Sequence, residues 1–266
     1  FSMLRGLYVA ASGMITETNR TDTIANNLAN AASSGYKRDE AINQEFAPVL
    51  LKRINDAQDD DVTSFRGFRL EQGPPRVGKL GLGAYTAEIA TDHVQGALKT
   101  TGNMLDLAVS GEGYFAIQTP QGVRYTRDGS FYRQANGALV TARGQAVLNT
   151  QNRPIILPDS ADISIGAKGE ITAGGRRVDT LQFVQFDDRR AVLKQGDNLY
   201  RPQQGAQPQA ATGEIQQGML ENSNVNIASE MVGLINNYRI YEAGSRALVT
   251  QDSMTDKTVN EVGRTS

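Results

Sequence analysis

Cysteine and tryptophan are absent from this 266-residue chain, and it holds a single histidine, His93. The lack of cysteine excludes disulfides, zinc–thiolate sites and cysteine nucleophiles, and one histidine excludes metal sites built from several histidines. A serine–histidine–aspartate triad would have to use His93. That residue lies in a polar segment, where a structural or solvated role is the simpler interpretation. No catalytic residue, metal site or cofactor is therefore predicted.

Excess charge and long apolar runs are also missing. The chain has 27 Lys and Arg against 29 Asp and Glu, whereas a nucleic-acid groove needs a basic stripe. No stretch approaches the ~20 apolar residues of a membrane-spanning helix. We expect neither nucleic-acid binding nor membrane insertion. The apolar run 3–11 is too short for a secretory signal peptide, and polar residues follow it at 16–19, so export would need another route.

Aromatic residues make up only 6% of the chain. The core is therefore expected to be aliphatic and spread over several small layers. A chain of this length can bury such a core as one large domain or two modest ones.

Residues 4–32 show the spacing of a helix. Apolar and small side chains recur at intervals of three and four, as in a heptad seam. The seam residues are Leu4, Leu7, Ala11, Met14, Thr18, Thr21, Ala25 and Leu28. Half of them are Ala or Thr, which bury little surface, so the helix should be marginal in isolation and need other protein around it. An ordinary amphipathic helix on a globular domain would show the same periodicity.

The end of this helix is marked by asparagines and a glycine. Gly35 suits a left-handed cap position. Asn26, Asn27 and Asn30 are poor helix-interior residues. Their amides either pair with neighbouring backbone or simply fray the helix end.

The segment 36–83 gives little pattern and is expected to be an extended connection. Residues 41–54 fit a short helix or a strand. The acidic run 59–61 lacks the alternating ligands and the glycine of a calcium loop, which favours a solvated turn. Glycines predict a loop at 78–83.

Residues 84–213 read as a β domain. Short runs of alternating polarity are separated by Gly, Asn and Asp turns, which is typical of an antiparallel sandwich or irregular barrel. The pattern predicts a strand–turn–strand around 119–122. Asp128-Gly129 and Asn136-Gly137 are hairpin signals.

A second helical pattern occupies the C-terminal part. A polar linker at 202–213 precedes it, and the helix is expected from Ile227 nearly to the end. Asn226 or Ser229 could cap its first turn. The apolar stripe is wider than one seam, and such a helix needs more than one neighbour.

Several motifs of the chain resemble signatures of the bacterial flagellar rod and hook proteins. They lie at 24–30 and 34–38 near the start, at 96–103, 105–109, 111–115 and 125–131 in the β region, and at 220–226, 230–232 and 239–243 near the end. They occur in the family's order from end to end. Length and β-domain motifs resemble the proximal- or distal-rod proteins, with the distal rod favoured.

The resemblance implies an α+β fold and a non-enzymatic role. The N-terminal helical segment 3–35 and the C-terminal segment 214–266 would pair as an antiparallel coiled coil. They would flank the connection 36–83 and a mainly antiparallel β domain at 84–213. Subunits of this family leave the cell through the flagellar type III export apparatus. They would then assemble helically around a central channel in the basal body, outside the cytoplasm, and transmit torque.

The partners so implied are further copies of the chain, other rod and hook subunits, the export apparatus and the rings around the rod. We predict that the subunit interface lies on the two helical segments and the asparagine-rich stretches beside them. Its predicted residues are Leu4, Leu7, Met14, Asn26, Asn27, Leu28, Asn30, Asn224, Asn226, Met231, Leu234, Ile235, Tyr238, Tyr241 and Leu248.

Two other interpretations fit a β domain with helical ends. A secreted glycan hydrolase would need convergent acids, but adjacent acids such as Asp187 and Asp188 point to opposite faces of a strand. A secreted adhesin or binding module would pack its helical ends on itself and be a stable monomer.

Overall fold

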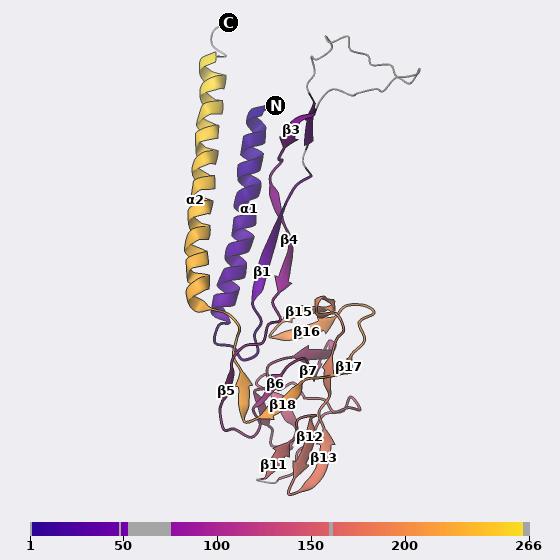
Figure 1. The fold of residues 1–266 in the computed structure, drawn as a ribbon. Helices are drawn as coiled ribbons and strands as arrows, with labels where there is room; N and C mark the ends of the chain where they lie inside the picture. Colours follow the sequence, from indigo (N-terminus) through magenta and orange to yellow (C-terminus); the bar gives the residue numbers. More distant parts are fainter. Residues whose placement is uncertain (1, 48, 53–75, 160–161, 263–266) are drawn as a thin grey trace, which may run out of the picture. The chain divides into compact units, whose positions relative to one another are not determined.

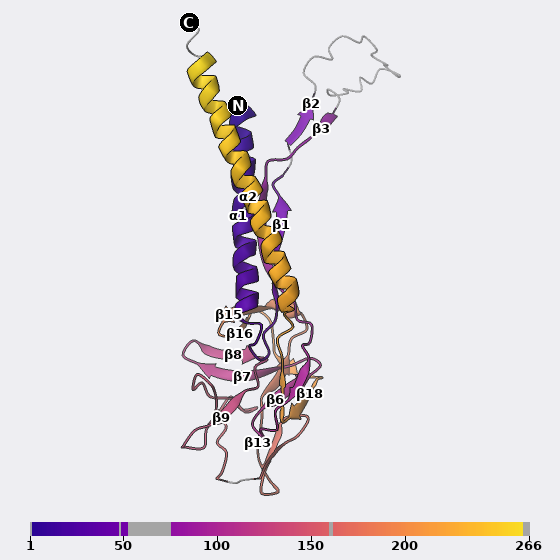
Figure 2. The ribbon, with the colours of Figure 1, turned by 90° about the vertical axis from the view of Figure 1, so that its left-hand side faces the viewer.

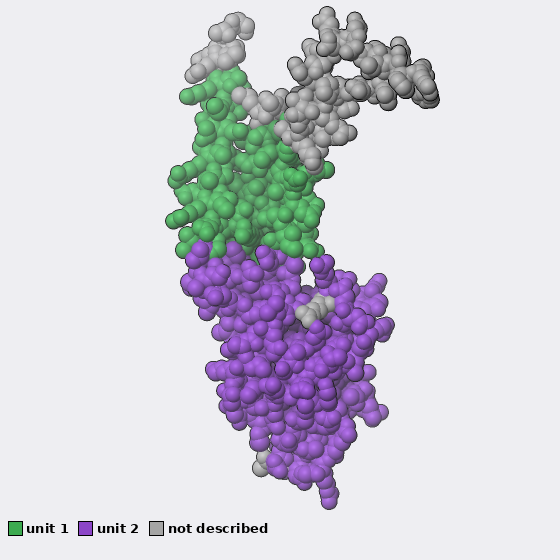
Figure 3. Space-filling model, viewed as in Figure 1, with its two compact units in different colours: residues 1–23, 41–89, 233–266 green, residues 24–40, 90–232 purple. Residues whose placement is uncertain are grey.

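The computed structural model describes residues 2–47, 49–52, 76–159 and 162–262. It has the predicted α+β class, with a helix near each end and antiparallel strands between them (Figure 1). The chain divides into two compact units. One holds residues 1–23, 41–89 and 233–266, and the other holds residues 24–40 and 90–232 (Figure 3).

Two long helices begin and end close to where the sequence predicts. Helix α1 spans Ser2–Ala29, and α2 spans Ile227–Lys257 before a π-helical turn at Thr258–Val262. Of the two predicted caps, Asn226 is the one used, since its Oδ1 accepts a hydrogen bond from the Ser229 amide at 3.1 Å. Neither helix, over its described residues, has the apolar length that crossing a membrane requires.

Among the described side chains of α1, the buried ones are mostly polar, with Ile24 as the apolar exception. Ser12, Thr16 and Thr23 are all buried. Each hydroxyl donates to a carbonyl three or four residues earlier in the helix, so burial leaves no donor unsatisfied. The predicted seam is wrong at Thr18 and Ala25, which are exposed.

Within the first unit, α1 and α2 lie side by side and run antiparallel (Figures 1 and 2). A Cβ at Gly6, near the start of α1, would fall on the side chain of Gln251, near the end of α2. A Cβ at Gly244 would lie 3.1 Å from Cγ of Met14. Residue numbers thus rise along one helix and fall along the other, and glycines allow the close approach.

Two strand pairs follow α1 in the sequence. β1 (Asp39–Glu45) pairs with β4 (Ala84–Thr91), and β2 (Val49–Lys52) pairs antiparallel with β3 (Arg76–Leu80). Residues 41–54 therefore contain strands, one of the two predicted alternatives. The loop predicted at 78–83 is wrong in its first half, because β3 continues to Leu80. The acidic run 59–61 lies outside the described residues.

The second unit is built from short antiparallel strands. Its largest sheet has the order β15-β16-β8-β7-β14-β17. Smaller groups are β9-β10, β11-β12-β13, β6-β18 and β5-β19. The strand bounds are β5 Leu98–Thr100, β6 Leu107–Ser110, β7 Tyr114–Thr119, β8 Gly122–Thr126, β9 Phe131–Arg133, β10 Leu139–Thr141, β11 Ile163–Ile165, β12 Glu170–Ala173, β13 Arg176–Thr180, β14 Phe183–Gln185, β15 Val192–Gly196, β16 Leu199–Pro202, β17 Gln209–Ala210, β18 Glu214–Gln217 and β19 Met219–Glu221.

Two of the three predicted turns are confirmed. β7 and β8 pair antiparallel around the turn at 119–122. Asn136-Gly137 lies between β9 and β10, with Gly137 at φ 83°. The hairpin predicted at Asp128-Gly129 is wrong, because β8 pairs with β7 and β16 instead of β9. Glycine at position 129 lets the backbone pass close to Leu107, since a Cβ there would overlap the carbonyl of Leu107.

Two apolar clusters meet at β7, whose side chains alternate between them. Phe115 and Ile117 enter one cluster, and Tyr114 and Ala116 enter the other. The second cluster is rich in aromatic residues and includes the fully buried Tyr200. The expected aliphatic core is therefore found in the first cluster, which is mostly aliphatic, but not in the second.

The C-terminal part of the chain passes through the β unit before α2 begins. The predicted linker 202–213 contains the short strand β17, after which β18 pairs with β6 and β19 pairs with β5. Glu221, the last residue of β19, thereby reaches the segment that leaves α1.

Candidate functional site

The segment that follows α1, residues 34–39, is held on both sides by hydrogen bonds, and we call it the junction segment. The Gly35 amide donates to the Glu221 carbonyl at 2.7 Å, and the Asp92 amide donates to the Arg38 carbonyl at 2.8 Å. The Asn198 side chain donates to the Ser34 carbonyl at 2.6 Å. All of these residues belong to the second unit, residues 24–40 and 90–232.

Two asparagines act as side-chain substitutes for a β-ladder. Asn27, 0% exposed, accepts from the Asp39 amide at 2.9 Å and donates to the Asp39 carbonyl at 2.7 Å. Asn224 accepts from the Arg38 amide at 2.7 Å and donates to the carbonyls of Asp92 and Val94. The predicted pairing of asparagine amides with neighbouring backbone is confirmed for Asn27, and these bonds tie both helical segments to the junction segment.

A buried carboxylate lies between two buried cations beneath the junction segment. Glu221 Oε1 accepts from Lys37 Nζ at 2.6 Å and from the Gly96 amide at 2.8 Å, and Oε2 lies 3.4 Å from Arg127 Nη1. Glu221 and Lys37 are each 1% exposed. Burial lowers the pKa of the Lys37 ammonium, and the neighbouring Glu221 carboxylate opposes that shift.

Two further ion pairs hold the same segment. Arg38 Nε donates to Glu230 at 2.6 Å, and Glu230 lies in the first turn of α2, where a negative charge is favourable. Lys194 Nζ bonds Asp39 Oδ2 at 2.8 Å and lies 3.9 Å from the centre of the Tyr36 ring. The two ion pairs thus fasten the junction segment to the first turn of α2 and to β15.

Sequence reasoning did not single out Lys37, Arg127 and Glu221 as a group. Each lies inside one of the family-like motifs, at 34–38, 125–131 and 220–226. The motifs are rich in other polar side chains, so no local signal distinguishes these three charges. Their mutual contact joins residues up to 184 positions apart, which no local pattern reveals.

Gly35 offers a test of how tightly the junction is packed. It has φ 65°, as its predicted left-handed position requires, and a Cβ there would lie 2.5 Å from the backbone carbonyl of Arg127. Gly175 has φ 75° with nothing within 4 Å. We expect Gly175→Ala to cost roughly 1–3 kcal/mol of unfolding free energy from backbone strain alone. Gly35→Ala should cost clearly more, as measured by denaturant unfolding of the full chain.

Equal losses in the two alanine variants would contradict a tightly packed junction. The comparison separates backbone strain, which both variants share, from steric overlap, which only Gly35→Ala introduces.

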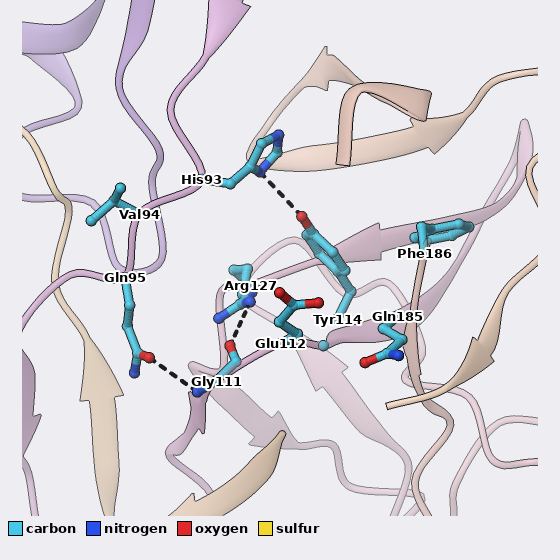
Figure 4. A pocket seen from close by; sticks show the side chains of 10 residues that line it. His93, Val94, Gln95, Gly111, Glu112, Tyr114, Arg127, Gln185 and Phe186 are labelled. Carbon is cyan, nitrogen blue, oxygen red and sulfur yellow. Dashed lines mark hydrogen bonds between the residues drawn. The ribbon is translucent and has the colours of Figure 1, made fainter. Parts of the chain in front are cut away.

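A pocket of ≈ 310 Å³ lies beside the junction in the same unit (Figure 4). His93 Nδ1 and the Tyr114 hydroxyl are 3.1 Å apart. Arg127 lies over the Tyr114 ring, 5.2 Å from its centre, and donates to the Gly111 carbonyl at 2.8 Å. No cluster of three or more potential metal ligands occurs among the described residues.

The outer side of α2 carries a row of exposed apolar side chains. Met231, Ile235 and Tyr238 are 49%, 54% and 58% exposed and share one face at spacings of four and three. Ile227 continues the row towards the start of α2, and Val249 lies further along the same face, beyond Glu242 and Ser245. We call this row the α2 apolar face. Exposed large apolar side chains that gather on one helix face indicate a protein-binding surface.

The predicted interface residues fall into three groups by exposure. Asn27 is buried within the chain. Leu7, Met14, Leu28, Asn30, Asn224, Leu234 and Leu248 are half-buried, and Asn26, Asn226, Met231, Ile235, Tyr238 and Tyr241 are exposed. The side chain of Leu4 lies outside what the structure describes. The exposed group therefore includes the centre of the α2 apolar face.

Three family models match the chain in sequence order. They are "Flagella basal body rod protein" over residues 7–37, "Flagellar hook protein FlgE/F/G D1 domain" over 108–173 and "Flagellar basal body rod FlgEFG protein C-terminal" over 216–261. The first includes most of α1 and most of the junction segment, and the last includes Glu221 and all of α2.

Curated relatives match over nearly the full length of both chains. The flagellar basal-body rod protein FlgG of Bacillus subtilis is 33% identical over 97% of this chain and 99% of its own length. FlgG of Agrobacterium fabrum is 34% identical over 94% and 97%, and FlgF of Caulobacter vibrioides is 32% identical over 98% and 99%. Agreement of this extent, together with helical ends tied to one β region, means that the chain belongs to the flagellar basal-body rod protein family.

Proposed function

We propose that this protein is a structural subunit of the bacterial flagellar basal-body rod and works as a polymer. The observation that carries the proposal is the α2 apolar face, whose large apolar side chains a monomer leaves in water. Lateral burial of this face in a polymer would stabilise the assembly by mass action. The full-length relatives named as rod proteins support the same role, which involves no catalysed reaction.

The helical ends would form the inner layer of the polymer. Segments 3–35 and 214–266 supply it, with α1 and α2 paired as an antiparallel coiled coil. The connection 36–83 leads to the outer β domain at 84–213. The antiparallel contacts of α1 with α2 support this pairing. Since the contacting residues are small, neighbouring helices are needed to complete the packing.

Torque would pass between helices and β domain through the junction segment. Its ion pairs and asparagine bridges fix the ends of both helices within one unit. Copies that contact head to tail without closing a ring build a helical filament, here around an export channel. The partners would be copies of this chain and other rod and hook subunits. Further partners would be the type III export apparatus and the rings around the rod. The assembled subunit would lie outside the cytoplasm.

The adhesin alternative requires helices that are covered by their own chain. Met231, Ile235 and Tyr238 remain uncovered, so the two ends are not packed as that alternative needs. No other observation favours it.

Loss of the gene tests the proposed role directly. We expect non-motile cells whose basal bodies, seen by electron microscopy, have truncated rods and no hook, because later subunits have nothing to assemble on. Restoring the wild-type gene should restore rods and swimming. Hook-bearing basal bodies on swimming deletion cells would contradict the rod assignment.

A further inference from the structure

A groove of ≈ 790 Å³ runs between α1 and α2 within the first unit. Its walls are mainly glycine and alanine, and charged residues stand at its two ends along α1. The small residues are Gly6, Ala10, Gly13, Ala243, Gly244 and Ala247, and the charged ones are Arg5 and Glu17. Helices lined by such small side chains leave holes that their own chain does not fill.

Gly13 has no reason within the chain to be glycine. It lies in the interior of α1, where glycine is the least favourable residue except proline. A Cβ there would meet nothing within 4 Å, and the backbone of Gly13 does not have the positive φ that favours glycine. Its neighbour in the groove differs, because a Cβ at Gly6 would overlap Gln251. Close approach of a surface from outside the chain explains a glycine at this place.

One acceptor at the groove is left without a hydrogen bond. Glu17 Oε2 is buried against the helices and has no partner in the described chain. An unpaired carboxylate oxygen at low exposure is costly, and a cation brought by a partner would relieve that cost.

The α2 apolar face has the complementary properties. Ile235 and Tyr238 are large and exposed, and Arg239 follows on the border of the same face, exposed to solvent. Little more than one turn of helix therefore presents bulky side chains for glycine- and alanine-lined holes and one guanidinium for the carboxylate.

We propose that the groove between α1 and α2 receives the α2 apolar face of a second copy of this chain, with Arg239 of that copy paired to Glu17. The inference rests on the proposed polymer and names the surfaces that make one of its contacts. Ile235 and Tyr238 fill the space over Gly13.

A charge exchange tests the pairing in cells that carry the full-length gene as their only copy. Glu17→Arg or Arg239→Glu alone should reduce hook-bearing basal bodies at least about tenfold, because each places like charges together. The double variant, Glu17→Arg with Arg239→Glu, should recover most of them. Asp22→Arg is the matched control, an exposed acid on α1 that does not line the groove, and should assemble normally.

The pairing would be overturned if either single variant assembled like the wild type. It would also be overturned if the double variant assembled no better than the single ones although its melting curve matched the wild type. The proposed function fails on a different result, since it requires that the wild-type gene restores rods to deletion cells.

Gly13→Ala gives a second readout that does not depend on charge. Alanine should raise the melting temperature of the soluble chain, because it favours the helix, and should lower assembly by narrowing the groove. Thr18→Ala is the control, an exposed position of α1 outside the groove that should raise stability without loss of assembly. A Gly13→Ala variant that is more stable and assembles as well as wild type would contradict the proposed contact.

Discussion

Glu221→Gln is expected to lower the free energy of unfolding by about 3–5 kcal/mol, because it leaves two buried cations without their counter-charge. The glutamine oxygen can still accept from Lys37 and Gly96, but its amino group would face Arg127, whose Nη1 lies 3.4 Å from the native oxygen. Folded proteins are usually stable by only about 5–15 kcal/mol, so a loss of this size would remove a large part of the free energy of unfolding. Denaturant unfolding of the full-length monomer measures it.

Glu242→Gln is the matched control for that substitution. Glu242 pairs with Arg246 at 2.6 Å, one turn along α2, and both side chains are exposed. Exposed pairs of this kind contribute only about 0.3–0.5 kcal/mol. Losses of similar size in the two glutamine variants would show that burial of the Glu221 network contributes little.

Removing one of the stranded cations should recover part of the loss. The double variant, Lys37→Met with Glu221→Gln, is expected to lose less unfolding free energy than the two single variants lose together. The difference should be roughly 1–3 kcal/mol, since the two side chains touch. Strict additivity would mean that Lys37 and Glu221 do not act as a pair.

How far the sequence predicts this fold depends on the range of the interaction concerned. The two helices and several strands follow from local periodicity and from turn residues such as Asn136-Gly137, whose effects act over a few positions. The Asp128-Gly129 hairpin fails because β8 finds its partners in β7 and β16. The pairing of β16 with β8 joins Leu199 to Thr126 across 73 positions, and no turn signal specifies that register.

The residues of the candidate site likewise include some that local spacing predicts and others that depend on contacts between distant parts of the chain. The exposed apolar row on α2 follows from helical spacing, and Met231, Ile235 and Tyr238 are recognisable in the sequence. The junction is different, because Asn27 and Glu221 have partners that only the folded chain brings near. The buried hydroxyls of α1, such as Thr16, also escape a hydrophobic pattern, since a bond to the helix backbone makes them compatible with burial.

Ile235→Asp is expected to abolish rod assembly and swimming while the monomer keeps its stability. Ile235 is 54% exposed in the chain, so an aspartate there remains solvated when the protein is alone. In the polymer the same position would be buried, where loss of the apolar contact costs about 1.5–3 kcal/mol per interface. Desolvation of the new carboxylate adds several kcal/mol, and because every copy repeats the defect, growth should stop.

Ile156→Asp is the control that assigns this effect to the helix. Ile156 belongs to the β unit and is 62% exposed, so the two substitutions match in residue type and exposure. Thermal melts of both purified variants should resemble the wild type, and only Ile156→Asp should return swimming and hook-bearing basal bodies to deletion cells. Full rescue by Ile235→Asp would exclude the α2 apolar face as a contact between subunits and leave its exposed side chains without a function.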